Sequence, residues 1–289
     1  MQHRRESDRR GSGAADRLRL VELAAPTELA PWLDALCQGE EPPAAAYVLR
    51  HAIPGPVCAR VAENFQRAVA EQGTPRSDGF VTAAQIGVTQ FEKNAADYLS
   101  QSAAAGPQVE RLFAGLNPIE RQTLFWGDLL PVELRRRGCE LAAAQLAGQR
   151  AGVCVARSWL NPGPFVLQPH EDAAQLSLVA AEGFEIAAAG RVFASVASVA
   201  SGQGGDLLLW DLVPDDLLRE ALGLLGTGYP YPSKLLENIP SVRVPLATGD
   251  LVLLDASRIH AVDAVRAGTR ITLGRFLGRV APGRVVWWT

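Results

Sequence analysis

The sequence predicts an α+β protein in which a mostly helical front half precedes a strand-rich half that begins near Ala151. In the front half, apolar residues recur at helical spacing. In the second half, many short apolar runs alternate with turns rich in Gly and Pro, a pattern typical of a sandwich or barrel. With 289 residues the chain is long enough to bury a substantial core.

The front half predicts helices separated by irregular loops. Residues 1–17 are polar and charged, and we expect them to form a disordered tail. A short strand is expected at residues 18–23. The clearest helix carries Val57, Val61 and Phe65 at a spacing of four and stops at Gly73. Further helices are expected at residues 26–36, 91–102, 108–116 and 132–147, and residues 74–89 are expected to be irregular.

The second half predicts strands around a single helical insertion. Strands are expected at residues 151–160, 165–179, 183–189, 191–197, 206–210, 241–246, 251–254, 258–264, 269–277 and 284–288. Pro214 opens a helix over residues 214–225, and a loop rich in Gly, Pro and Tyr follows at 226–240. No internal repeat is visible, so we expect one domain over residues 18–289, in which 18–150 support 151–289.

Bulk composition argues against several classes of partner. The net charge is −3, so no global basic field suggests nucleic acid, and no apolar run is long enough to span a bilayer. The four cysteines form no C-x-x-C pair and predict reduced thiols. No apolar signal segment follows the Arg-rich start, so we expect a cytoplasmic protein. The sequence leaves a homodimer open.

Three residues predict a metal site. His170 and Asp172 are two apart, so in an extended segment both side chains point to one face while Glu171 points to the other. His260 would come from a distant strand beside them. Two imidazoles and one carboxylate leave open positions on an octahedral ion, which is the pattern of non-haem Fe(II) oxygenases. Only four histidines occur in the chain, and two of them lie in this pattern.

Arg270 and Thr272 predict a site for an organic acid. They share one face of the expected strand, whereas Ile271 and Leu273 share the other. A guanidinium fork with a neighbouring hydroxyl suits a carboxylate, because paired charged hydrogen bonds are strong and orienting. Arg275 shares no face with Arg270 and is the weaker candidate.

As a set, these motifs resemble those of the Fe(II)/2-oxoglutarate-dependent oxygenases. That family has H-x-D/E, a distal His and an Arg about ten residues later, and here Arg270-Ile271-Thr272 begins ten residues after His260. The flanking segments 157–163 and 249–255 match as well, and the resemblance covers about residues 151–278. It implies a double-stranded β-helix, or jelly roll, with the helical half packed against one face.

The resemblance also implies the chemistry. Fe(II) would be bound by His170, Asp172 and His260, and 2-oxoglutarate by Arg270 and Thr272, with O₂ as oxidant. The expected reaction is hydroxylation of an unactivated C–H of a small molecule, a free or N-substituted amino acid, with release of succinate and CO₂. Related carrier-free halogenases have Gly or Ala in place of Asp172. Two alternatives stay open: desaturation or cyclisation at the same site, and a cupin-like metal-binding protein without activity.

Further residues are candidates for the pocket wall. Trp159 is assigned to the co-substrate, although large aromatic residues on strands usually lie in the core. Substrate contacts are assigned to Arg157, Gly79, Tyr229 and Tyr231. We expect residues 227–240, with the helix at 214–225, to form a lid, because long insertions between strands often gate a site. Residues 76–91 are the second candidate for the wall.

Overall fold

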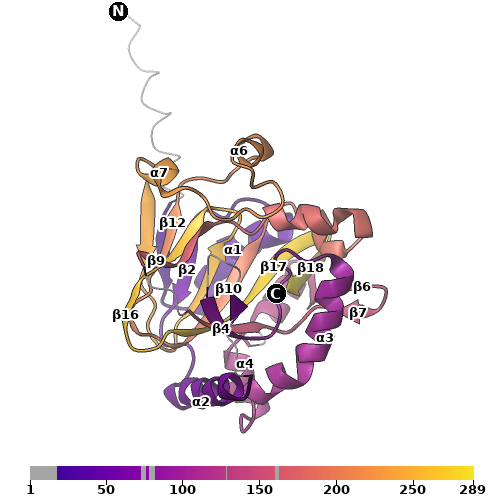
Figure 1. Ribbon diagram of the computed structural model, residues 1–289. Coiled ribbons are helices and arrows are strands. Elements are labelled where there is room, and N and C mark those ends of the chain that lie inside the picture. Colours follow the sequence, from indigo (N-terminus) through magenta and orange to yellow (C-terminus); the bar gives the residue numbers. More distant parts are fainter. Residues whose placement is uncertain (1–17, 73–75, 78–81, 128, 160–162) are drawn as a thin grey trace, which may run out of the picture.

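The protein combines helices with two large β-sheets (Figure 1). The computed structural model describes residues 18–72, 76–77, 82–127, 129–159 and 163–289. Within these ranges the mixture of helix and sheet confirms the predicted mixed class. None of the helices described there is long and apolar enough to cross a membrane.

The larger sheet has ten strands in the main order β1-β2-β14-β10-β17-β8-β4-β3, and β18 joins β17 to β5. Its strands are β1 Leu20–Leu23, β2 Ala46–Leu49, β3 Arg76–Ser77, β4 Thr82–Ile86, β5 Glu140–Ala143, β8 Val155–Trp159, β10 Phe193–Ala200, β14 Leu251–Asp255, β17 Ile271–Ala281 and β18 Arg284–Trp288. The smaller sheet has the order β13-β12-β15-β9. Its strands are β9 Phe165–His170, β12 Leu207–Trp210, β13 Ser241–Val244 and β15 His260–Asp263. Two short ribbons pair β6 Gln145–Leu146 with β7 Gln149–Arg150, and β11 Gln203–Gly204 with β16 Val265–Ala267.

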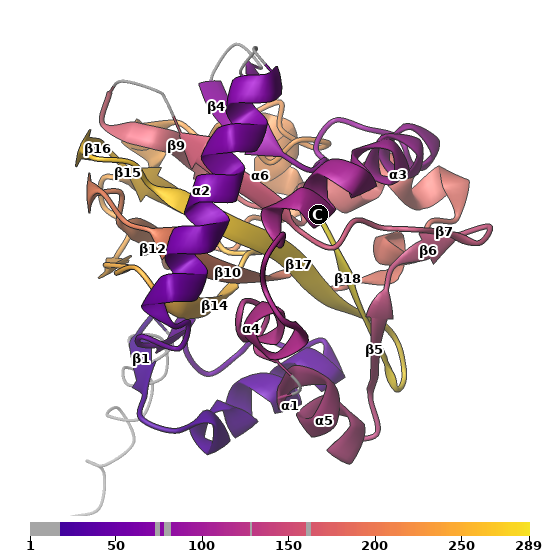
Figure 2. The ribbon, with the colours of Figure 1, turned by 90° about the horizontal axis from the view of Figure 1, so that it is seen from below.

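Most of the helices belong to the front of the chain. The helices are η1 Pro26–Leu29, α1 Ala30–Gln38, α2 Gly55–Gln72, α3 Ala95–Leu112, α4 Pro118–Thr123, α5 Leu129–Arg136, η2 Ala174–Glu182, η3 Glu185–Ala188, α6 Asp216–Ala221 and α7 Ser233–Leu236. Figure 2 shows α1, α2, α4 and α5 across one face of the large sheet, with β9, β12 and β15 beyond its other face.

Alternation along the strands separates two apolar layers. On β14, Leu251 and Leu253 pack in the cluster that contains the helices, whereas Val252 and Leu254 pack between the sheets. Successive side chains of a strand point to opposite faces, so each central strand of the large sheet contributes to both layers. The space between the sheets is therefore lined by alternate residues of β10, β14 and β17.

The front part of the chain is more mixed than the sequence predicted. β1 confirms the short strand expected at residues 18–23. β2 and β4 are further strands of the large sheet, and β4 lies within the stretch expected to be irregular. Ala83 pairs with Trp159 on β8, and Ile86 pairs with Ala156. Pairing with a neighbouring strand fixes β4, because its own sequence has little alternation of apolar and polar residues.

Three predicted helices in the front part had the wrong limits. The helix expected at 132–147 ends at Arg136, because Gly138 adopts a φ of 74° and residues 140–143 then pair in parallel with β18. The helices expected at 91–102 and 108–116 are one helix, α3, which continues through Pro107. Its buried side chains, such as Leu99 and Leu112, hold both halves against the core.

Two predicted strands near the site were also wrong in part. The strand expected at 165–179 ends at His170, and the 3₁₀ helix η2 follows it. The strand expected at 183–189 is instead the 3₁₀ helix η3, whose Ile186 packs with Phe184 in the layer between the sheets. In both places apolar burial was recognised correctly, but short apolar runs do not distinguish a strand from a helical turn.

Packing of α1 on the large sheet should contribute measurably to stability. Trp32 and Phe193 are fully buried, and their rings meet edge to face at 5.4 Å. We expect Phe193→Ala to lower the free energy of unfolding by about 3–5 kcal/mol, because a cavity adds to the lost transfer energy. Urea denaturation measures this. Ile119→Ala, at a side chain that is 75% exposed, should change it by less than about 0.5 kcal/mol; equal effects would contradict the packing described.

Candidate metal and co-substrate site

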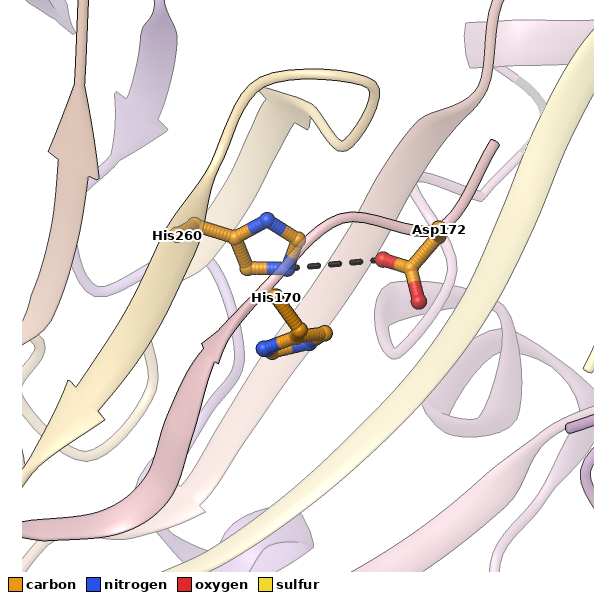
Figure 3. A group of neighbouring side chains, drawn as sticks. All are labelled: His170, Asp172 and His260. Carbon is orange, nitrogen blue, oxygen red and sulfur yellow. Dashed lines mark ion pairs between the residues drawn. The ribbon is translucent and has the colours of Figure 1, made fainter. Parts of the chain in front are cut away.

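Strand pairing brings the three predicted metal ligands together (Figure 3). β9 and β15 are antiparallel neighbours, and His260 lies opposite His170. Opposed residues on one face of an antiparallel pair are close, and the two imidazole centroids are 4.1 Å apart. Asp172 follows two residues after His170, and its Oδ2 lies 3.4 Å from His260 Nε2. The three potential ligand atoms all lie within 4.8 Å of one another.

Backbone carbonyls fix the orientation of both imidazoles. His170 Nδ1 lies 2.8 Å from the carbonyl oxygen of Gln168, and His260 Nδ1 lies 2.9 Å from that of Arg258. A carbonyl oxygen can only accept, so each Nδ1 carries the proton and each Nε2 keeps its lone pair. This arrangement is the usual support for a metal-binding histidine.

Asp172 is held just beyond the end of β9. Its amide donates to the carbonyl of Ala256, and its Oδ1 accepts a 3.3 Å hydrogen bond from Gln175 Nε2. The other oxygen, Oδ2, therefore faces His260. Gln175 is buried, and its contact with Asp172 was not predicted from the sequence. Its position three residues after Asp172 would have been informative only if the turn that follows β9 had been recognised.

Burial sets the protonation of the triad. Desolvation lowers the pKa of His170 well below its ordinary value and also lowers that of His260, which keeps both imidazoles neutral. Burial raises the pKa of Asp172 to about 7, and the positive charge of Arg157 opposes this rise. A bound cation would favour the carboxylate form, because opposite charges stabilise each other in a desolvated site.

Glu171 points away from the triad, as predicted. Its carboxylate accepts hydrogen bonds from the amides of Ala173 and Ala174 and forms an ion pair with Arg219 on α6. These bonds occupy the first amides of the turn that leads into η2. The extended segment therefore ends directly after His170, where the sequence had predicted a longer strand.

Arg270 is a buried cation beside the triad. It is only 7% exposed, and it makes no hydrogen bond or ion pair within the part of the chain that is described. Burial lowers its pKa to about 10, which leaves it charged at neutral pH. A Cβ on Gly205 would lie 2.6 Å from Arg270 Cδ, so the glycine makes room for this side chain. Thr272 borders the same cavity, whereas Ile271 and Leu273 face the helices, as the strand alternation predicted.

Two adjoining cavities lie at the triad, and we call the one that reaches between the sheets the inner part and the other the mouth. His170 and Asp172 border both, whereas His260 borders the inner part. The inner part is lined by Arg270 and Thr272 and by apolar residues that include Val196, Leu207, Val252 and Leu254. The mouth is lined by Phe91, Arg157, Trp159, Gln175, Tyr229 and Phe276.

Arg157 and Trp159 lie where the two parts meet. Both side chains line the inner part as well as the mouth, and the Arg157 guanidinium carbon is 5.3 Å from the centre of the Trp159 ring. Arg157 Nε donates to Gln85 Oε1 at 3.1 Å. A cation is therefore held at the border of the two spaces, beside Asp172.

The other predicted site residues differ in whether they reach the cavity. Tyr229 lines the mouth, with its ring 6.1 Å from the His170 ring. Tyr231 does not reach the cavity, because it is buried in a separate apolar cluster with Trp210 and Ile259. Gly79 lies outside the described residues. The guanidinium of Arg275 packs between the rings of Phe125 and Trp287, and Arg275 also borders the inner part.

The residues fit a divalent metal with an anionic co-substrate. Two neutral imidazoles with free Nε2 atoms and one carboxylate form a 2-His-1-carboxylate set. No described carboxylate forms an ion pair with the buried Arg270, although the charge of Asp206 acts on it at longer range. Such a buried charge is costly unless an anion is bound to it, since burial of a charge demands pairing. Fold and site together thus define the class of the non-haem iron oxygenases that use a 2-oxo acid.

Comparison with known proteins identifies the family. The chain is 38% identical over 245 residues to the L-isoleucine 3(1)-dioxygenase of Pantoea ananatis (strain AJ13355), a match that covers 84% of this chain and 83% of that enzyme. No family model matches the chain. The chain belongs to the Fe(II)/2-oxoglutarate-dependent oxygenases, and it is a 2-oxoglutarate-dependent dioxygenase that uses Fe(II) and O₂. This relationship shows that the chain is an enzyme and excludes the alternative of a cupin-like metal-binding protein without activity.

Solved structures share the fold. A dioxygenase from Burkholderia ambifaria AMMD that acts on N-substituted L-amino acids has a TM-score of 0.53 and 18% identity, covering 90% of this chain and 91% of that one. The same enzyme in complex with 2-oxoglutarate has a TM-score of 0.51 and 17% identity, with the same coverage.

We predict that His170→Ala, Asp172→Ala and His260→Ala each abolish turnover and the stabilisation that Fe(II) confers. Metal at about 100 times its Kd should add about 2.7 kcal/mol to the unaltered protein. Thermal unfolding with and without Fe(II), under anaerobic conditions, measures the loss. His51→Asn is the matched control, because His51 is exposed and asparagine tolerates its positive φ of 50°. A variant that kept the full shift would remove its residue from the site.

We predict that Arg270→Ala raises the KM for 2-oxoglutarate and leaves the metal-induced stabilisation intact. Loss of a charged contact in a buried site costs about 2–5 kcal/mol, or about 30-fold to several thousand-fold in affinity. Initial rates at varied 2-oxoglutarate give the KM. Arg266→Ala, at an exposed residue four positions earlier, serves as the control. An unchanged KM would transfer the role to Arg157 or Arg275.

Proposed function

We propose that the enzyme hydroxylates an aliphatic C–H of a free α-amino acid and releases succinate and CO₂. The observation that carries this proposal is the mouth of the cavity, where one cation, Arg157, stands among the aromatic rings of Phe91, Trp159, Tyr229 and Phe276 next to the triad. Such a space suits a small molecule with one carboxylate and one apolar chain. The activity of the L-isoleucine dioxygenase relative supports the same class of substrate.

In this proposal each group of residues has one task. His170, Asp172 and His260 hold Fe(II), and Arg270 with Thr272 holds the distal carboxylate of 2-oxoglutarate in the inner part. Bound Fe(II) would activate O₂ as the oxidant, and oxidation of 2-oxoglutarate to succinate and CO₂ would supply two of the four electrons that O₂ accepts, the other two coming from the carbon that is hydroxylated. The chain itself orients the substrate and excludes water. The two sheets form the double-stranded β-helix core, and the front helices support it.

Arg157 is assigned to the carboxylate of the substrate. Its guanidinium lies at the border of the mouth while its Nε stays hydrogen-bonded to Gln85. The apolar chain of the substrate would then lie along Tyr229 and Phe276, near the metal. Trp159 contacts Arg157 and closes the wall between co-substrate and substrate.

Substrate-dependent succinate formation tests the proposal. The purified enzyme with Fe(II), 2-oxoglutarate and O₂ is given L-isoleucine, L-leucine, L-valine and L-methionine, and their N-acetyl and N-succinyl forms. We expect free amino acids to stimulate succinate release and to gain one oxygen atom by mass spectrometry. Turnover of the N-acyl forms alone would contradict the proposal, and a dehydrogenated or cyclised main product would favour the same-site alternatives.

We predict that Arg157→Met raises the KM for the amino acid more than the KM for 2-oxoglutarate. A lost charge-assisted contact costs about 1.5–3 kcal/mol, which is about 10- to 150-fold. An amine that lacks the carboxylate of the best substrate is the matched chemical control, because the substitution should barely change its weak turnover. Equal increases in both KM values would assign Arg157 to the co-substrate.

A further inference from the structure

Glu171 joins the metal-binding strand to the insertion that follows β12. It stands between two ligands of the triad and is fully buried, yet its carboxylate faces away from the cavity. Glu171 Oε1 accepts a 3.0 Å hydrogen bond from Arg219 Nε on α6. Arg219 also contacts Asp216, but that carboxylate is 81% exposed. Of the two ion pairs only the one with Glu171 is buried, and removal of one partner would leave an uncompensated charge.

Backbone hydrogen bonds also attach this insertion to the residues on either side of His170. The amide of Glu171 donates to the carbonyl of Gly228, and the amide of Tyr231 donates to the carbonyl of Pro169. The chain comes so close at Gly228 that a Cβ there would lie 2.5 Å from Glu171 Oε1. Residues 228–231 thus run along the end of β9, in the manner of an added strand.

This attachment determines where Tyr229 lies. Tyr229 lies between Gly228 and Tyr231, the two residues that are hydrogen-bonded to the end of β9. Its ring centroid is 6.1 Å from that of His170 and 5.7 Å from that of Phe91, and it borders the mouth. It does not line the inner part that holds Arg270 and Thr272. A shift of residues 228–231 would therefore alter the mouth and leave the inner part unchanged.

We propose that Glu171 is a positioning residue, which acts through Arg219 and residues 228–231 to place Tyr229 as a wall of the substrate space. The inference rests on the proposed function in one respect, namely that the mouth receives the amino acid. It assigns a task to the residue between the two ligands of the H-E-D segment. Without the ion pair, residues 228–231 would be held less firmly beside the substrate. The target carbon of the substrate would then be positioned less accurately, whereas the binding of 2-oxoglutarate would stay the same.

The test uses Arg219→Met and Glu171→Gln in the full-length enzyme, with Asp216→Asn as the matched control for the exposed partner of Arg219. We expect the first two to raise the KM for the amino acid by about tenfold or more, since misplacement by about 1 Å can cost a hundredfold. The share of consumed 2-oxoglutarate that ends as hydroxylated product should fall. The KM for 2-oxoglutarate and the stabilisation by Fe(II) should stay within about twofold of the unaltered enzyme, and Asp216→Asn should match it in all four readings.

A double substitution tests whether the effect passes through Tyr229. If both residues act on the same wall, Tyr229→Ala should raise the KM for the amino acid little further in the Arg219→Met variant, because the effects of coupled residues are not additive. Full additivity would overturn the proposal. Equal increases in both KM values, or loss of the Fe(II) shift in Arg219→Met, would also overturn it, since those results indicate general disruption of the site.

Hydrogen exchange separates this inference from the proposed function. The amides of Glu171 and Tyr231 should exchange faster in Arg219→Met than in Asp216→Asn, whether or not any amino acid is a substrate. Unchanged exchange at both amides would refute the attachment by the ion pair. If exchange rises but no amino acid is turned over by the unaltered enzyme, the attachment stands and the assignment of the substrate fails.

Discussion

The antiparallel pairing of β9 with β15 is the constraint on which the site depends. It places His260 opposite His170 although the two residues are ninety positions apart in the chain. The carbonyls of Gln168 and Arg258 then hold both Nδ1 atoms, which leaves the Nε2 atoms as the metal ligands. A slip of one residue in this register would move one imidazole to the opposite face, and the three ligands would no longer meet.

The large sheet separates the chemistry from the stabilising core. Its central strands present Leu251, Leu253 and Ile271 to the helices, and their alternate residues line the cavity. The helices thus stabilise the sheet from the side away from the reaction. The cavity can in consequence hold desolvated charges such as Arg270 and Asp172, which a bound co-substrate and metal would neutralise.

The sequence alone determined the class of the fold and the identity of the central residues. Histidine is scarce, so the spacing of His170, Asp172 and His260 was informative, and the alternation around Arg270 predicted which side chains face the cavity. These features are local: a two-residue period and a motif depend only on neighbours along the chain. The helix at 55–72 was predictable for the same reason.

Only the tertiary structure decided the mouth of the cavity and the surroundings of the triad. Gln175 reaches Asp172 because Glu171 ends the strand and starts a turn, and Tyr229 rather than Tyr231 lines the mouth because residues 228–231 are tied to β9. The strand β4 and the end of α5 likewise depend on pairing with β8 and β18. Each of these outcomes depends on contacts between segments distant in sequence, whose energies outweigh local propensity and leave no signal in the local pattern.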